Sequence, residues 1–153
     1  LAPTAFWTLF RATDSAEERA LHTVAYADAE RTLRRLKQVD KIISIITGAP
    51  HWIAQMEIAK LNGAPHDFYL SITDSKYKEK PNPESFHYAL EQLPAKQDET
   101  LYIGNSNEDA YYAKNTGVDF VYLERKEHQF DLKDYAVATI HSLDELFTKP
   151  VQA

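Results

Sequence analysis

The 153-residue sequence contains no cysteine and no long apolar run, and each absence excludes a class of protein. Without cysteine there is no disulfide framework, no thiolate metal centre and no cysteine nucleophile. The longest apolar stretch, Ile42 to Ile46, is far too short to span a bilayer. The chain opens at Leu1 with neither a methionine nor a signal peptide, so we expect it to be the interior of a longer gene product.

The charge balance also argues against two kinds of partner. Seventeen basic and 23 acidic residues give a net charge of -6, which is unfavourable for binding nucleic acid or an anionic membrane. Hydrophobic residues make up 44% and charged residues 26%, as in an ordinary globular domain. The absence of cysteine fits a reducing compartment, and we therefore expect a cytoplasmic protein.

Apolar segments and helical segments alternate along the chain. Patterns typical of helices cover 15–22, 28–38 with Asp28 as the cap, 51–61, 83–93, a stretch ending near 115, and a short segment from about 142. Strand patterns cover 42–46, 68–70, 101–103, 120–123 and 137–140. Strict alternation of this kind predicts an α/β fold with a mostly parallel sheet covered by helices on both faces.

Polar side chains gather where the predicted strands end, and ligands bind at this edge of a parallel sheet. A hydroxyl, a lysine and a carboxylate at one edge suit a phosphoryl group, because the hydroxyl binds its oxygens and the lysine offsets its charge. A carboxylate with an amide oxygen beside it offers the hard ligands that Mg²⁺ prefers. The candidate residues are Thr47, Gly48, Lys80, Asn105, Ser106 and Asp109.

Three segments, Thr47-Gly48, Lys80-Pro81-Asn82-Pro83 and Gly104 to Asp109, occur in this order along the chain. They resemble the second, third and fourth motifs of the haloacid dehalogenase (HAD) superfamily of phosphotransferases and phosphatases, over about Tyr26 to Leu146. The resemblance implies a Rossmann-like three-layer sandwich with a mostly parallel sheet. The central strand, which carries the first motif in that superfamily, is missing or non-standard here.

The resemblance also implies a role for each candidate residue. Thr47 and Lys80 would be catalytic, and together with Gly48 they would bind the phosphoryl group. Asp109 and Asn105 would hold Mg²⁺. Asn105 departs from the pattern, since many members carry aspartate at that position, and the amide removes one negative charge from the metal site.

The first motif, an aspartate nucleophile at a strand end, is not recognisable. Asp28, Glu30 and Thr32 have its spacing but lie in a predicted helix. The stretch Thr4 to Phe10 resembles a variant of the motif with threonine in the nucleophile position. In a third interpretation, residues 1–25 are a leader left from a helical cap, residues 26–153 are the core, and the nucleophile lies upstream of Leu1.

We therefore expect a HAD-like hydrolase, a Mg²⁺-dependent phosphatase of a small phosphorylated metabolite that works through a phosphoaspartyl intermediate. The alternative is a catalytically inactive binding domain that has lost the nucleophile. A dehalogenase needs the same missing aspartate, and a phosphoacceptor receiver domain does not fit the motif spacing. Deleting the central strand leaves two half-sheets with unpaired edges, which predicts a homodimer or strand exchange.

Overall fold

The computed structural model describes residues 16–148, and the structural statements below concern these residues. Within them no helix has the length and apolar character needed to cross a membrane. The helices are α2 (Ala16–His22), α3 (Ala27–Gln38), α4 (His51–Ala59), α5 (Glu84–Glu91) and α6 (Asn107–Thr116). The strands are β1 (Ser44–Thr47), β2 (Phe68–Ser71), β3 (Leu101–Gly104), β4 (Asp119–Leu123) and β5 (Ala136–Ile140).

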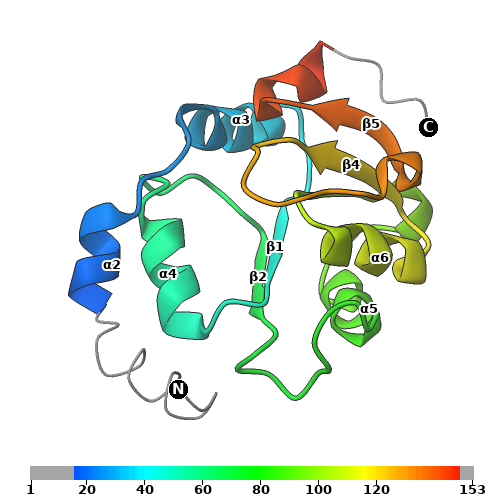
Figure 1. The fold of residues 1–153 in the computed structure, drawn as a ribbon, viewed down its shortest axis with the longest axis horizontal. Coiled ribbons are helices and arrows are strands. Elements are labelled where there is room, and N and C mark those ends of the chain that lie inside the picture. The colour runs from blue at the N-terminus through cyan, green and yellow to red at the C-terminus, as the bar shows by residue number, and fades with distance from the viewer. Residues whose placement is uncertain (1–15, 149–153) are drawn as a thin grey trace.

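The strands form two separate parallel sheets. Strand β1 pairs with β2 in a register that runs from Ser44 opposite Phe68 to Thr47 opposite Ser71. The second sheet has the order β3-β4-β5, with both pairings parallel. In Figure 1, β1 and β2 are seen apart from the β4–β5 layer, which lies above α6. The predicted α/β architecture is confirmed, and so are the two half-sheets expected where a central strand is lacking from the described residues.

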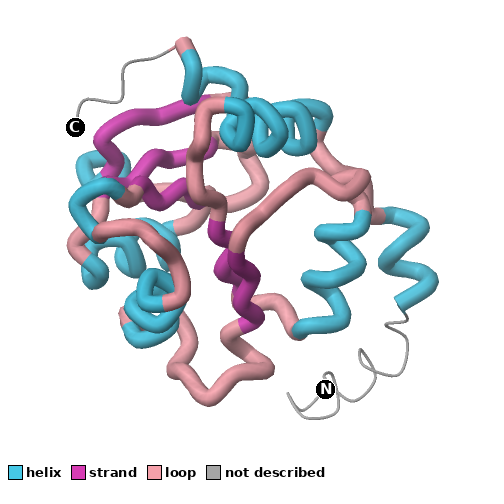
Figure 2. Tube along the Cα trace, turned by 180° about the vertical axis from the view of Figure 1, so that it is seen from behind, coloured by secondary structure: helices cyan, strands magenta, loops and turns pink. Residues whose placement is uncertain are grey.

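Helices cover the sheets in the pattern expected for parallel strands. Helix α6 packs against β3 and β4, whereas α5 packs against β1 and β2. Helix α2 packs against α4, and α3 packs against a short 3₁₀ helix, Leu143–Phe147, that follows β5. Figure 2 shows both sheets from behind, with loops joining each strand to its helix.

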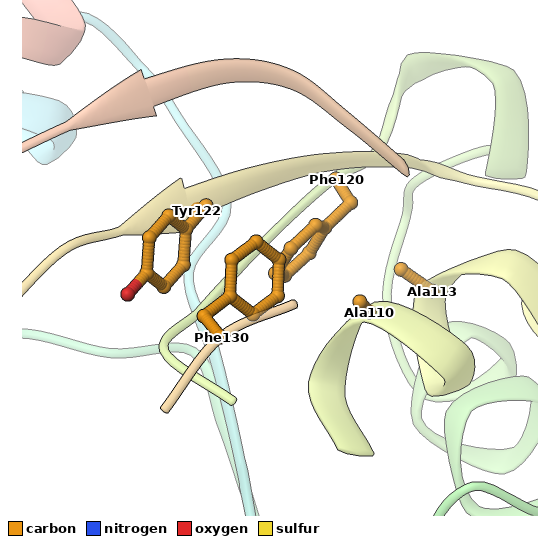
Figure 3. Close-up of a cluster of buried hydrophobic side chains, with 5 residues drawn as sticks. All are labelled: Ala110, Ala113, Phe120, Tyr122 and Phe130. Carbon is orange, nitrogen blue, oxygen red and sulfur yellow. The ribbon is translucent and has the colours of Figure 1, made fainter. Parts of the chain in front are cut away.

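The main hydrophobic core lies between β4 and α6. Phe120 and Tyr122 of β4 pack with Phe130 and with Ala110 and Ala113 of α6 (Figure 3). The Tyr122 and Phe130 rings stack with their centroids 3.8 Å apart. Strand β4, the middle strand of the three-stranded sheet, is therefore buried. The apolar residues of β1 and β3, each at an edge of its sheet, are half-buried or exposed.

The start of α3 differs from the sequence prediction. Asp28 is not the cap: the helix begins at Ala27, and Asp28 lies buried in the first turn. Its carboxylate pairs with Arg125 and accepts hydrogen bonds from the Ser142 hydroxyl and the Leu143 amide. Because Asp28 lies in a helix, its stretch is not a first motif at a strand end. The other candidate stretch, residues 4–10, lies outside the described residues.

Candidate functional site

A buried ion pair joins two of the predicted site residues at the carboxyl end of β3. The Lys80 ammonium lies 2.9 Å from Oδ1 of Asp109, and the two side chains are 9% and 12% exposed. Lys80 also donates to the Tyr102 hydroxyl at 2.7 Å, and that hydroxyl donates to Asp109 Oδ1 at 3.1 Å. Two polar groups, a carboxylate in the first turn of α6 and a hydroxyl on β3, thus fix the position of the lysine charge.

The other oxygen of Asp109 holds the turn that follows β3. Oδ2 accepts from the Asn105 amide at 3.2 Å and from the Ser106 hydroxyl at 2.9 Å. The Ser106 hydroxyl in turn accepts from the Asp109 amide, so Ser106 is the N-cap of α6. A carboxylate has about four acceptor positions, and four donors contact this one.

Gly104 is required by the close approach of Asp109 to the strand. A Cβ added at Gly104 would lie 2.5 Å from Asp109 Cβ and 2.6 Å from its Cγ, closer than such atoms approach each other. Only a residue without a side chain lets the first turn of α6 pack this tightly against the end of β3. Gly104 therefore determines where the Asp109 carboxylate lies.

The electrostatics keep this cluster in one charge state at neutral pH. Burial by itself raises the pKa of the Asp109 carboxyl, but the Lys80 charge and the hydrogen bonds from Lys80 and Ser106 hold it below its ordinary value. Burial and the neighbouring Asp109 charge raise the pKa of Tyr102 well above its ordinary value. Asp109 is consequently ionised, and Tyr102 is a neutral hydrogen-bond donor.

A second tyrosine contributes to the surroundings of Lys80. The Lys80 ammonium lies 5.4 Å from the centroid of the Tyr112 ring and 5.5 Å from that of the Tyr102 ring. The Tyr112 hydroxyl lies 2.7 Å from the buried Ser85 hydroxyl, and burial raises the pKa of Tyr112 to about 12. Two aromatic faces thus help to hold the buried lysine charge.

The turn after β1 forms a separate group. The Thr47 hydroxyl accepts from the Ala49 amide at 3.0 Å, and Ser71 donates to the Ala49 carbonyl at 2.8 Å. A Cβ added at Gly48 would meet nothing within 4 Å, so open space lies beside the backbone there. Within residues 16–148 no hydrogen bond or ion pair joins Thr47 or Gly48 to Lys80. The structure therefore brings together Lys80, Asp109 and Asn105 but does not link them to the Thr47 turn.

Oxygen atoms of the kind that binds Mg²⁺ lie around Asn105. The Asn105 Nδ2 atom donates to Glu127 Oε2 at 2.9 Å, and its backbone amide donates to Asp109. The carboxylates of Glu127 and Asp109 therefore both contact Asn105. Mg²⁺ prefers oxygen ligands, keeps several of its waters and is usually bound by one or two protein carboxylates. No three acidic or histidine side chains converge on one point within residues 16–148. These oxygen atoms are of the kind that Mg²⁺ prefers, and they could supply part of its coordination shell.

Sequence reasoning did not single out Tyr102 or Glu127. Tyr102 is the one polar side chain within Leu101-Tyr102-Ile103, a strand that leads directly to the candidate turn, and this was the available signal. Glu127 belongs to a mixed-charge loop that reads as solvated surface. Its contact with Asn105 spans 22 residues, and no local pattern indicates it.

Comparison with known proteins finds one family model and several related enzymes. A family model described as "Haloacid dehalogenase-like hydrolase" matches residues 5–123. A phosphoglycolate phosphatase of Colwellia psychrerythraea is 33% identical over 102 residues, which cover 66% of this chain and 45% of that protein. The pyrophosphatase PpaX of Bacillus mycoides is 32% identical over 97 residues, covering 63% of this chain and 45% of that protein. The chain thus spans less than half the length of these two relatives.

Solved structures share the fold. A HAD phosphatase from Thermococcus onnurineus aligns with a TM-score of 0.76 at 24% identity, over 95% of this chain and 69% of that one. CbbY from Rhodobacter sphaeroides, crystallised in complex with phosphate, aligns with a TM-score of 0.72 at 15% identity, over 95% of this chain and 67% of that one. At these identities the likeness establishes the Rossmann-like architecture alone.

Proposed function

The chain belongs to the haloacid dehalogenase-like hydrolase family, and on that premise we propose that it carries the phosphate-binding half of a phosphatase active site. The observation that carries the proposal is the buried Lys80–Asp109 pair at the carboxyl end of β3, where parallel sheets bind ligands. A lysine fixed by a carboxylate, a tyrosine hydroxyl and two aromatic faces is preorganised to stabilise charge on a transferring phosphoryl group. The substrate we propose is a small phosphorylated metabolite.

In the proposed reaction, each group has a defined task. An aspartate oxygen attacks phosphorus, the bond between phosphorus and the substrate oxygen breaks, and water then hydrolyses the resulting phosphoaspartyl group to release phosphate. Lys80 offsets the negative charge of this group, and Thr47 and the Gly48 backbone bind its oxygens. Asp109 keeps Lys80 in position through the contact at 2.9 Å.

The aspartate nucleophile is proposed to lie on a strand between β1 and β3, outside the described residues. Strand β1 pairs within its sheet with β2, and β3 pairs with β4, so each has an edge open to a further strand. A strand inserted there would cover the half-exposed apolar residues of β1 and β3 and would end beside Lys80 and Thr47.

Mg²⁺ is proposed as the cofactor of this site. Asn105 would offer its side-chain oxygen, and the Asp109 carboxylate would add negative charge next to it while it holds Lys80. When bound, the ion would polarise the phosphoryl oxygens and offset their charge.

This proposal is tested by measuring turnover with the protein purified from its native source. Phosphate release should be measured with Mg²⁺ on 2-phosphoglycolate, pyrophosphate and p-nitrophenyl phosphate. Lys80→Met should reduce kcat by roughly 100-fold or more, the usual effect of losing one electrostatic group. Lys78→Met is the matched control, because Lys78 is exposed and forms an ion pair with the exposed Glu84 at 3.4 Å, away from the Lys80–Asp109 pair.

The possible results separate the two functions considered for this chain. Hydrolysis that is lost in Lys80→Met and retained in Lys78→Met supports the phosphatase. Phosphate binding without hydrolysis of any of the three substrates would indicate an inactive binding domain instead. Equal rates in the two variants would contradict the role assigned to Lys80.

A further inference from the structure

The replacement of the expected acid by Asn105 is accompanied by a carboxylate close by. Asn105 lies at the end of β3, and the side chain of Glu127 reaches it from the loop after β4. Its Oε2 atom accepts a hydrogen bond from Asn105 Nδ2 at 2.9 Å. Asn105 and Glu127 together carry a formal charge of -1. An aspartate at position 105 and a neutral residue at position 127 would carry the same charge.

This hydrogen bond also sets the orientation of the Asn105 amide. Glu127 is a pure acceptor when ionised, so the Nδ2 side of the amide must face it. The Asn105 oxygen is on the opposite side of the planar amide and is turned away from Glu127. An aspartate at position 105 would place two carboxylates at hydrogen-bond distance, where like charges repel.

Glu127 is held in this position by contacts from the start of α3. The Tyr26 hydroxyl donates to the second carboxylate oxygen, Oε1. The Tyr26 ring lies under the Arg125 guanidinium, 4.2 Å from its central carbon, and Arg125 is tied to Asp28 and donates to the His141 carbonyl at 3.1 Å.

The loop backbone contributes to the same placement. Lys126 adopts a left-handed conformation with φ of 60°, and the chain bends there between Arg125 and Glu127. A solvated surface glutamate has no need of such a framework. Glu127 is exposed, so solvent and ions reach its carboxylate.

We propose that Glu127 is a positioning residue that orients the Asn105 oxygen toward the metal position and supplies the negative charge that asparagine lacks. The inference rests on the proposed function, since it concerns the Mg²⁺ of that site. Residues that orient a metal ligand in this way change metal affinity by about 10- to 100-fold when they are replaced.

The test is the affinity of the natively produced protein for Mg²⁺ alone, measured by isothermal titration calorimetry. Glu127→Gln should weaken binding by about tenfold. The double variant Asn105→Asp with Glu127→Gln moves the single charge to position 105, and it should restore affinity to within roughly threefold of the wild type. Glu124→Gln is the matched control on the same loop, because Glu124 contacts His141 at 2.8 Å, and it should bind Mg²⁺ as the wild type does.

Two results would overturn the inference. One is unchanged Mg²⁺ affinity in Glu127→Gln, and the other is failure of the double variant to recover affinity while its thermal melting matches the wild type. Either result together with normal phosphate release by the wild type leaves the proposed phosphatase standing. A wild type that neither binds Mg²⁺ nor releases phosphate contradicts both proposals.

Discussion

Two buried ion pairs of similar composition occupy different regions of the molecule. Lys80–Asp109 lies at the carboxyl end of β3, with side chains 9% and 12% exposed. Arg125–Asp28 lies between α3 and the loop after β4, with side chains 13% and 5% exposed. Burial and charge alone do not distinguish them. The groups around each pair do.

The surroundings of Asp28 connect structural elements to one another. Its carboxylate binds Arg125, the Ser142 hydroxyl and the Leu143 amide, and so joins α3 to the segment after β5. The surroundings of Asp109 instead gather groups at one sheet edge: Lys80, Tyr102 and the turn with Asn105. We infer that the Asp28–Arg125 pair stabilises the fold, and we propose that the Asp109–Lys80 pair positions a cation for chemistry.

The largest effect is expected from breaking the structural pair. Asp28→Ala leaves the Arg125 charge buried and unpaired, which should lower the free energy of unfolding by about 3–5 kcal/mol. Urea denaturation of the chain measures this change. Glu30→Ala, on the same helix, is the control, because Glu30 forms an exposed pair with Arg34 and its loss should alter stability little. Equal stability of the two variants would contradict the structural role of Asp28.

Gly104→Ala tests the packing that positions the functional pair. The added methyl group overlaps Asp109, so the first turn of α6 must shift, at a cost of about 1–3 kcal/mol in the free energy of unfolding. Gly48→Ala is the stability control, because its methyl group meets open space. Thermal denaturation of both variants checks the prediction. A Gly104→Ala variant as stable as Gly48→Ala would contradict the close approach.

Tyr102→Phe removes one hydroxyl from the functional pair and keeps the ring. The lost hydrogen bonds to Lys80 and Asp109 should lower the free energy of unfolding by about 0.5–1.5 kcal/mol. The exposed Tyr111 serves as the control through Tyr111→Phe, which should be close to neutral. A smaller loss in Tyr102→Phe than in the control, by urea denaturation, would argue that the hydroxyl does not hold Lys80.

Acid should reduce the stability difference between the wild type and the Asp28→Asn variant. Burial alone raises the Asp28 pKa, but hydrogen bonds from Arg125, Leu143 and Ser142 lower it from its ordinary value of 3.8. The stabilisation is therefore complete above that value and is lost as the pH falls through the lower pKa of the folded state. The stability difference between wild type and Asp28→Asn should shrink from pH 7 to pH 3. A constant difference by urea denaturation at the two pH values would contradict this linkage.

The sequence was informative where signals are local. Strand and helix patterns predicted the parallel α/β fold. The end of the strand at 101–103 indicated Asn105 and Asp109, and the loop before the helix of 83–93 indicated Lys80; the structure brings these three residues together. Position 28 was predicted wrongly, because aspartate before a helix usually caps it, and its distant partner Arg125 decides otherwise. Contacts across many residues, such as Tyr26 with Glu127, leave no local pattern.

The roles of Thr47 and Gly48 in binding phosphate remain predictions. Each lies at the expected strand end. The Thr47 hydroxyl accepts from the Ala49 amide within its own turn, and the Thr47 and Gly48 carbonyls accept from Ile72 and Thr73, which follow β2. Strand position is encoded locally by apolar residues and turns. The distance between two half-sheets depends on what lies between them, which these residues do not specify.

The comparison of the two ion pairs is tested most directly by one assay on matched variants. Asp109→Asn and Asp28→Asn each neutralise one buried carboxylate, and kcat for phosphate release by the natively produced protein should be measured at a temperature where both remain folded. Mg²⁺ should be saturating, so that any change in Mg²⁺ affinity passed from Asp28 through Arg125 and Tyr26 to Glu127 does not affect kcat. We predict that Asp109→Asn lowers kcat by about 100-fold, because Lys80 loses its anchor, whereas Asp28→Asn retains the rate of the wild type. Equal loss in both variants, or none in Asp109→Asn, would contradict the account.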